Sequence, residues 1–225
     1  MDLYVMLSSC VPATEHLETS GAKLSANDLL KYKTHPKVLG LAEMMNVPGV
    51  LYKDEEVLRK ILNFQDQPID GHCPSLTGHD LNAYIAAGIR SCHESVTLKE
   101  AEEKLQKGMQ VLLREGSVAK NLSDLSAILT PYASPCVSLC TDDRNPVDIL
   151  DEGHMDHLIR LGIRRGLNPE SVYRAASWST AVAYGLKGKG EISPGADADI
   201  VVLDDYKKCK VAYVLKAGQI IKGPR

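Results

Sequence analysis

Three short polar clusters, each at the end of an apolar, strand-like run, contain His72, His93 and Asp142. The two histidines are 21 residues apart, about the length of one strand, one helix and two turns, and Asp142 follows 49 residues later, about two such units. Two imidazoles and a carboxylate are ligand types that borderline divalent metals accept. The spacing therefore predicts one shared metal site at the carboxyl ends of strands.

Two further carboxylates are expected near this site. Glu43 ends the strand-like run 38–42, so its side chain would project at the same end of the sheet. Glu94 directly follows His93 and could shuttle protons, because a metal lowers the pKa of its bound water from 15.7 toward about 7. The simpler alternatives are a surface glutamate at a helix start for Glu94 and a helix N-cap for Asp142.

His154 and His157 form a second candidate pair. They are three residues apart on a predicted helix face, a spacing that could bind a metal. A helix start with solvated polar residues is the favoured interpretation. A lone histidine after a strand is likewise more often a turn or packing residue, and the agreement in spacing is what favours a site at His72 and His93.

Composition narrows the class of protein. The chain has 225 residues, of which 44% are hydrophobic and 24% charged, and can bury a sizeable core. The net charge of −3 and the dispersed basic residues argue against a nucleic-acid polymer as partner. The 6 cysteines form no Cys-x-x-Cys pair, and no leader or membrane-spanning run is found. Reduced thiols, no membrane association and a cytoplasmic location are expected.

Apolar runs alternate with amphipathic segments, the order typical of parallel strands linked by helices. Strands are expected at Leu3–Leu7, Val38–Met45, Pro68–His72, Ile89–His93, Val111–Leu113 and Val137–Cys140. Helices are expected at Ser25–Tyr32, Asp54–Phe64, His79–Ala87, Thr97–Met109, Leu122–Ile128 and His154–Arg165, with Ser25 and Thr97 as N-caps. A closed (β/α)₈ barrel needs eight units and roughly 250 residues. Six units thus predict an open doubly wound sheet or a barrel lacking two units.

The pattern changes near the C-terminus. After a final helix at about Pro169–Tyr184, short alternating runs occur at Ile200–Leu203 and Val211–Leu215, with turn signals at 194–195 and 217–218. We therefore expect a partial barrel over residues 1–185 and a small β appendage over residues 186–225.

Several stretches closely resemble the bacterial adenine deaminases of the amidohydrolase superfamily. They are Asp70–His72 through His93–Glu94, Glu115–Asn121 and Leu139–Pro146, with support from Met6–Thr14, Gly40–Met45, Tyr173–Ser179 and Ile192–Val202. The last of these is generic to the superfamily, and the match spans essentially the whole chain.

The resemblance implies a TIM-type (β/α)₈ barrel, here incomplete, and a small β-sandwich domain. It implies that Glu43 bridges two metal ions, that His72 and His93 ligate one of them, and that Asp142 contacts the metal-bound hydroxide. The metals would be manganese, iron or zinc. The implied reaction is hydrolytic deamination of free adenine to hypoxanthine and ammonia, in purine salvage and adenine catabolism, by a homo-oligomer.

The sequence departs from the family in two ways. It has no His-x-His pair, so it resembles an internal piece or a shortened form that begins near barrel strand three and ends before the C-terminal domain. Cys92 stands where the family usually has Asp, which would alter the orientation of His93. Weak metal binding and little deaminase activity are expected of this chain alone. Cyclic-amide hydrolysis or deacetylation, and a non-catalytic remnant, are the alternatives.

Overall fold

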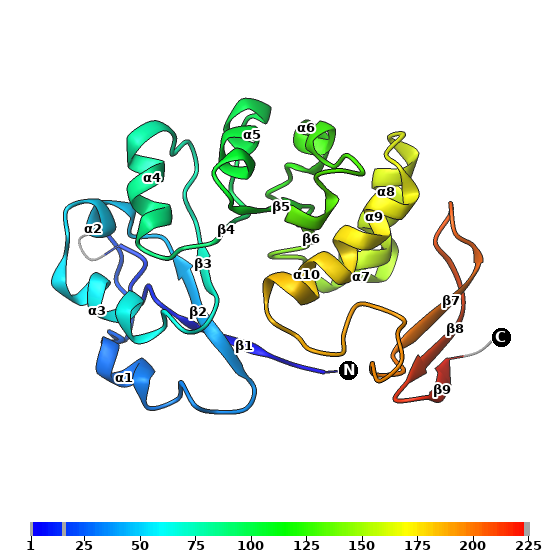
Figure 1. The fold of residues 1–225 in the computed structure, drawn as a ribbon, viewed down its shortest axis with the longest axis horizontal. Helices are drawn as coiled ribbons and strands as arrows, with labels where there is room; N and C mark the ends of the chain where they lie inside the picture. The colour runs from blue at the N-terminus through cyan, green and yellow to red at the C-terminus, as the bar shows by residue number, and fades with distance from the viewer. Residues whose placement is uncertain (1, 15–16, 223–225) are drawn as a thin grey trace. The chain divides into compact units, whose positions relative to one another are not determined.

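The computed structural model describes residues 2–14 and 17–222 (Figure 1). The chain divides into two compact units, an N-terminal unit of residues 2–111 and a C-terminal unit of residues 112–225. Both units contain helices and strands, and each is described by itself.

The N-terminal unit is built on parallel strands. One sheet has the order β1 (Val5–Ser8), β2 (Val38–Met44) and β3 (Ile69–Gly71), and both of its strand pairs are parallel. β4 (Ser91–Cys92) pairs in parallel with the first two residues of β5 (Gln110–Arg114). The connecting helices are α1 (Ala26–Leu30), α2 (Val47–Leu51), α3 (Glu55–Asn63), α4 (Gly78–Ala86) and α5 (Leu98–Gln106). This order confirms the predicted alternation of parallel strands and helices.

Local signals explain where these helices begin. Ser25 caps α1 in a capping box with Asp28, and the Thr97 hydroxyl caps α5 by accepting from the Glu100 N–H, which confirms both predicted N-caps. Behind the sheet, Leu41, Ile61 and Tyr84 are buried in one apolar core. Burial of a leucine or isoleucine side chain contributes about 1.5–3 kcal/mol. The strands are thereby held at fixed positions in the unit.

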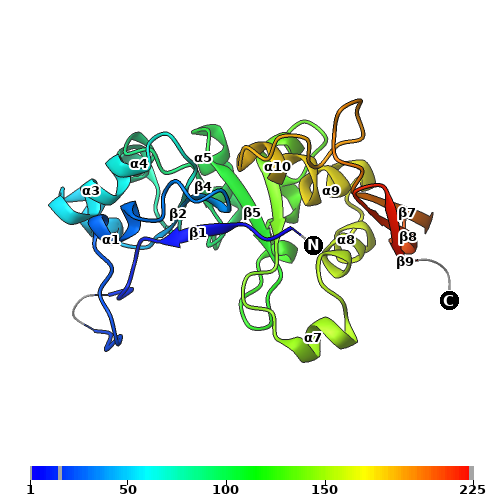
Figure 2. The same cartoon turned by 90° about the horizontal axis from the view of Figure 1, so that it is seen from below.

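The C-terminal unit contains the end of β5, β6 (Val137–Cys140) beside it, and an antiparallel sheet. The sheet has the order β7 (Ile200–Asp205), β8 (Lys210–Lys216) and β9 (Gln219–Lys222). The helices are α6 (Leu122–Leu125), η1 (Ser126–Ile128), η2 (Ser134–Cys136), α7 (Pro146–Asp151), α8 (Met155–Arg164), α9 (Pro169–Ala176) and α10 (Trp178–Ala183). Figure 2 shows α7 projecting away from α8 and α9, and it has no buried residue.

The structure corrects some element boundaries. The single helix expected at Pro169–Tyr184 is broken at Ser177, where φ of −134° and ψ of −83° leave the helical region, so α9 and α10 are separate. Two short helices, α2 and α7, were not predicted from the sequence. Each begins at an asparagine cap closely followed by proline, Asn46 before Pro48 and Asn145 before Pro146.

The fold class is confirmed as mixed α/β with parallel strands, whereas every sheet in the described residues has three strands. Closure into an eight-stranded barrel and the domain boundary after residue 185 stay predictions. The antiparallel sheet matches the β appendage expected near the C-terminus, with β9 as an unpredicted third strand. Within the described part of the chain, no helix has the length and apolar character needed to span a membrane.

Candidate metal centre

Three of the predicted ligand side chains converge in the N-terminal unit. The Oε2 atom of Glu43 lies 3.0 Å from Nδ1 of His72 and 2.9 Å from Nε2 of His93. The two imidazole rings meet edge to face, with their centroids 5.4 Å apart. One nitrogen or oxygen atom of each side chain lies within 4.8 Å of those of the other two. The structure brings Glu43, His72 and His93 together, and their role as metal ligands stays a prediction.

The backbone around Glu43 and His72 is held by hydroxyl groups. The Ser9 hydroxyl, beyond β1, donates a hydrogen bond to the Glu43 carbonyl oxygen at 2.6 Å. The buried Tyr84 hydroxyl of α4 donates to the Met44 carbonyl at 2.5 Å and accepts from the His72 N–H at 3.1 Å. Burial raises the pKa of Tyr84, so its hydroxyl stays protonated and remains a donor. These bonds fix the ends of β2 and β3 beside each other.

Glycine at position 71 lets β3 approach β4. A methyl group built at Gly71 would lie 2.5 Å from the Ser91 carbonyl oxygen. The Ser91 hydroxyl also donates to the Asp70 carboxylate at 2.5 Å. Because His72 and His93 each follow the end of one of these strands, the close approach sets their side chains next to each other.

The electrostatics of the cluster favour a cation. Burial by itself would raise the pKa of the Glu43 carboxyl, but hydrogen bonds from His72 and His93 outweigh burial and lower this pKa to about 2. Glu43 is therefore ionised at neutral pH, and the imidazole nitrogens that face it donate their N–H groups. Once a metal displaces these N–H protons, the same carboxylate oxygen and imidazole nitrogens are ligand types that a borderline divalent metal accepts. The side chains are 32%, 27% and 16% exposed for Glu43, His72 and His93, which gives an ion access.

Glu94 lies beside the cluster. Its Oε1 is 3.9 Å from Nδ1 of His72 and 3.8 Å from Nε2 of His93, beyond hydrogen-bond distance from either. The side chain is 20% exposed. A carboxylate at this separation is suited to holding or moving a proton. The catalytic role of Glu94 stays a prediction.

Asp142 belongs to the C-terminal unit, where it follows β6. Its Oδ2 accepts a hydrogen bond from the Arg114 guanidinium at 2.6 Å, and its backbone φ of 52° lies in the left-handed region that aspartate tolerates better than most residues. Asp142 is therefore fixed by an ion pair and is not the predicted alternative of a helix N-cap. Its place beside Glu43, His72 and His93 stays a prediction.

His154 and His157 were considered as a pair on one helix face, but His154 lies outside the helix. His154 is the N-cap of α8, with φ of −112° and ψ of −117°, and its Nε2 lies 3.2 Å from the Thr141 hydroxyl. His157 lies within the first turn of α8, and its Nε2 is 3.8 Å from the Glu152 carboxylate. This arrangement supports the favoured interpretation, a helix start with polar partners.

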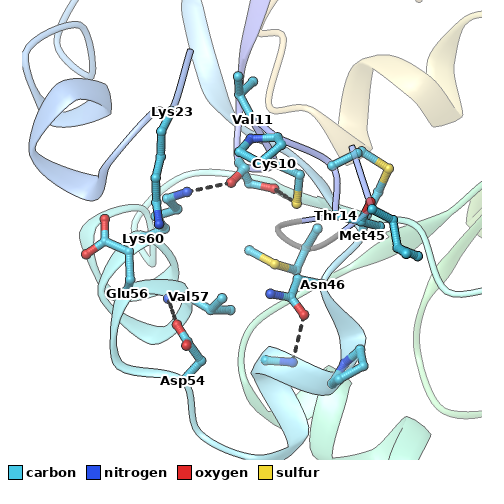
Figure 3. A pocket seen from close by; sticks show the side chains of 17 residues that line it. Cys10, Val11, Thr14, Lys23, Met45, Asn46, Asp54, Glu56, Val57 and Lys60 are labelled. Carbon is cyan, nitrogen blue, oxygen red and sulfur yellow. Dashed lines mark hydrogen bonds between the residues drawn. The ribbon is translucent and has the colours of Figure 1, made fainter. Parts of the chain in front are cut away.

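A cavity of about 590 Å³ opens at the carboxyl ends of β1 and β2 in the N-terminal unit (Figure 3). Its wall includes Cys10 after β1 and Met45 after β2. Figure 3 shows Lys60 reaching from α3 to the backbone after β1, where its ammonium donates to the Ser9 carbonyl at 2.8 Å. The volume is in the range of small-molecule pockets. Glu43, His72 and His93 are not among the residues that line this cavity, so it is distinct from the candidate metal centre.

Carboxylate and imidazole side chains that meet where parallel strands end are the arrangement expected of a hydrolase built on parallel strands. The sequence matches the Amidohydrolase family over residues 1–223, so the chain belongs to the amidohydrolase family. It is 57% identical over 220 residues to the adenine deaminase of Cereibacter sphaeroides, covering 98% of this chain and 39% of that protein. Identity to the adenine deaminase of Brucella anthropi is 55% over 221 residues, at the same coverages. The chain spans about two fifths of the length of these relatives.

Solved structures show the same fold. The β-aspartyl dipeptidase of Fervidobacterium islandicum superimposes with a TM-score of 0.63, covering 91% of this chain and 62% of that chain at 16% identity. At this identity the match concerns the fold alone. Together with the family match, it confirms the resemblance predicted from the sequence and an amidohydrolase-type α/β fold.

Proposed function

We propose that this chain forms part of an adenine deaminase, which hydrolyses adenine to hypoxanthine and ammonia with the help of divalent metal ions. The observation that carries the proposal is the single carboxylate oxygen of Glu43 that faces nitrogen atoms of both His72 and His93. The identity to adenine deaminases supports the substrate.

The residues of this chain have distinct proposed roles. Glu43, His72 and His93 would hold the metal ions of a binuclear centre. When bound, a divalent ion supplies Lewis acidity and lowers the pKa of water to near neutrality. Glu94 and Asp142 accept and return protons while water adds to C6 of adenine and the bond to the amino nitrogen breaks. The proton taken from water leaves with that nitrogen, so that the products are hypoxanthine and ammonia.

The remaining parts of the proposal concern the whole enzyme. We propose that residues 1–185 complete a (β/α)₈ barrel with segments like those of the longer relatives, and that residues 186–225 belong to a small β-sandwich. Manganese, iron or zinc occupies the centre, and the enzyme serves purine salvage in the cytoplasm as a homo-oligomer.

A chimera tests the activity. This chain replaces the matching segment of the Cereibacter sphaeroides adenine deaminase, and ammonia and hypoxanthine are measured with adenine as substrate. We expect equal amounts of both products, and nearly complete loss of turnover on Asp142→Asn, which preserves shape but removes the proton acceptor. A folded, metal-loaded chimera that releases no ammonia from adenine would contradict the proposal.

A further inference from the structure

A charged pair is buried in α5, behind the candidate metal centre. The Lys104 side chain is 0% exposed and that of Glu100 is 4% exposed, and Nζ lies 2.6 Å from Oε1. Burial of two ions costs more than their attraction usually returns, and apolar replacements are often at least as stable. The contacts of the two side chains therefore indicate a role other than stability.

Lys104 holds the residues next to both candidate histidine ligands. Its ammonium donates to the Cys73 carbonyl oxygen at 2.7 Å, and Cys73 directly follows His72. It also contacts the Cys92 sulfur and the Ser95 hydroxyl oxygen, each at 3.3 Å. Cys92 directly precedes His93, so one ammonium contacts the backbone after β3 and the side chain before His93.

Glu100 holds the same two loops by their backbone. Its Oε1 accepts from the Ser75 N–H at 2.8 Å, and its Oε2 accepts from the Val96 N–H at 2.9 Å. With the Lys104 contacts, residues 73–75 and 92–96 are tied to a single point on α5. Helix α5 thus forms hydrogen bonds with both loops that begin at the candidate ligands.

A neighbouring ion pair provides a contrast on the same helix. Lys107 and Glu103 have the same spacing as Lys104 and Glu100 and their charged atoms are also 2.6 Å apart, but their side chains are 25% and 27% exposed. Their loop contacts are with the N–H and carbonyl of Gly78, which lies outside residues 73–75 and 92–96. The two pairs therefore have the same residue types, charges and spacing. Only Glu100 and Lys104 contact the loops that follow His72 and His93.

We propose that Lys104 and Glu100 form a buried clamp that sets the positions of His72 and His93 and thereby controls the affinity and geometry of the metal centre. The two residues are positioning residues that do not touch the metal, and this role rests on the proposed metal-dependent function. Loss of partners that orient metal ligands typically weakens metal binding by about 10- to 100-fold.

The test compares two double variants of the 225-residue chain. Lys104→Met with Glu100→Gln removes the clamp while leaving no unpaired buried charge, and Lys107→Met with Glu103→Gln is the matched control. Co²⁺ is titrated into each protein, and affinity and visible absorption spectrum are recorded. Hydrogen exchange at the Ser75 and Val96 amides is measured in metal-free protein. Lys104→Arg, which keeps the buried charge but changes the contacts with Cys73 and Cys92, serves if the clamp double variant does not fold.

The expected result is Co²⁺ binding at least about 10-fold weaker, a changed absorption spectrum and faster exchange at Ser75 and Val96 in the clamp variant. The control should match the wild type. Equal Co²⁺ affinity and spectra in the wild type and a folded clamp variant would overturn the clamp. A wild-type chain that takes up no Co²⁺ would contradict the proposed metal centre instead, and the exchange rates would then decide whether the clamp orders the loops.

Discussion

Gly71 of β3 and Ser91 of β4 approach each other so closely that a methyl group added at Gly71 would lie 2.5 Å from the Ser91 carbonyl oxygen. These residues stand one and two positions before His72 and His93, respectively. The distance between the two candidate ligands therefore depends on the absence of a side chain at residue 71.

Gly71→Ala should lower the free energy of unfolding by about 1–3 kcal/mol, because the added methyl group is forced against backbone in a packed interior. Gly21→Ala is the control, since a methyl group there would meet no atom within 4 Å. Urea unfolding of both variants measures the effect. Wild-type stability in Gly71→Ala would show that the strands can separate without cost.

Tyr84→Phe should lower the free energy of unfolding by about 1–3 kcal/mol. Removing the hydroxyl takes away the hydrogen bonds that it forms with the Met44 carbonyl and the His72 N–H. Tyr52→Phe is the matched change at a side chain that is 85% exposed, and it should have little effect. Chemical denaturation of the two variants gives the comparison. Equal stabilities would mean that other groups replace the Tyr84 hydroxyl.

Asp199 should make the stability of the C-terminal unit depend on pH. Its carboxylate accepts from the Lys189 and Lys216 ammonium groups, each at 2.6 Å, and from the Ala217 N–H at 3.0 Å. The hydrogen bond from Lys189, with those from Lys216 and Ala217, lowers the pKa of Asp199 below its usual 3.8. A lowered folded-state pKa stabilises the fold above the unfolded-state value, and this stabilisation is lost as pH falls below it.

The matching variant is Asp199→Asn. Its stability deficit relative to the wild type should be constant above about pH 5 and should shrink as pH falls below about 4. Thermal unfolding of both proteins from pH 7 to pH 2.5 gives the deficit. Lys216→Met, which removes one partner, should show a smaller pH dependence than the wild type. A deficit that grows toward low pH would have the wrong sign.

Much of the fold and site could be predicted because both follow from local patterns. Period and chain spacing were enough to locate the strand ends that carry Glu43, His72 and His93, since parallel strands place their carboxyl ends together. The break at Ser177 could not be foreseen, because the apolar periodicity continues through it.

The buried pair of Glu100 and Lys104 was also not predicted from the sequence. Glu100 and Lys104 are an i,i+4 pair in a strongly charged helix, and such pairs normally lie on a solvated face. The exposed pair Glu103 and Lys107 has the same signature. Burial of one pair and exposure of the other depend on the loops packed against α5, which no local pattern encodes.

Equilibrium binding of Mn²⁺ measures whether Glu43, His72 and His93 hold a divalent metal. We expect saturable binding by the wild type, about 10-fold or greater weakening in His93→Ala and in Glu43→Gln, and no change in His79→Ala, an exposed histidine of the same unit. Binding should also raise the melting temperature as ligand linkage requires. Mn²⁺ affinity that is the same in the wild type, His93→Ala and Glu43→Gln would contradict the account.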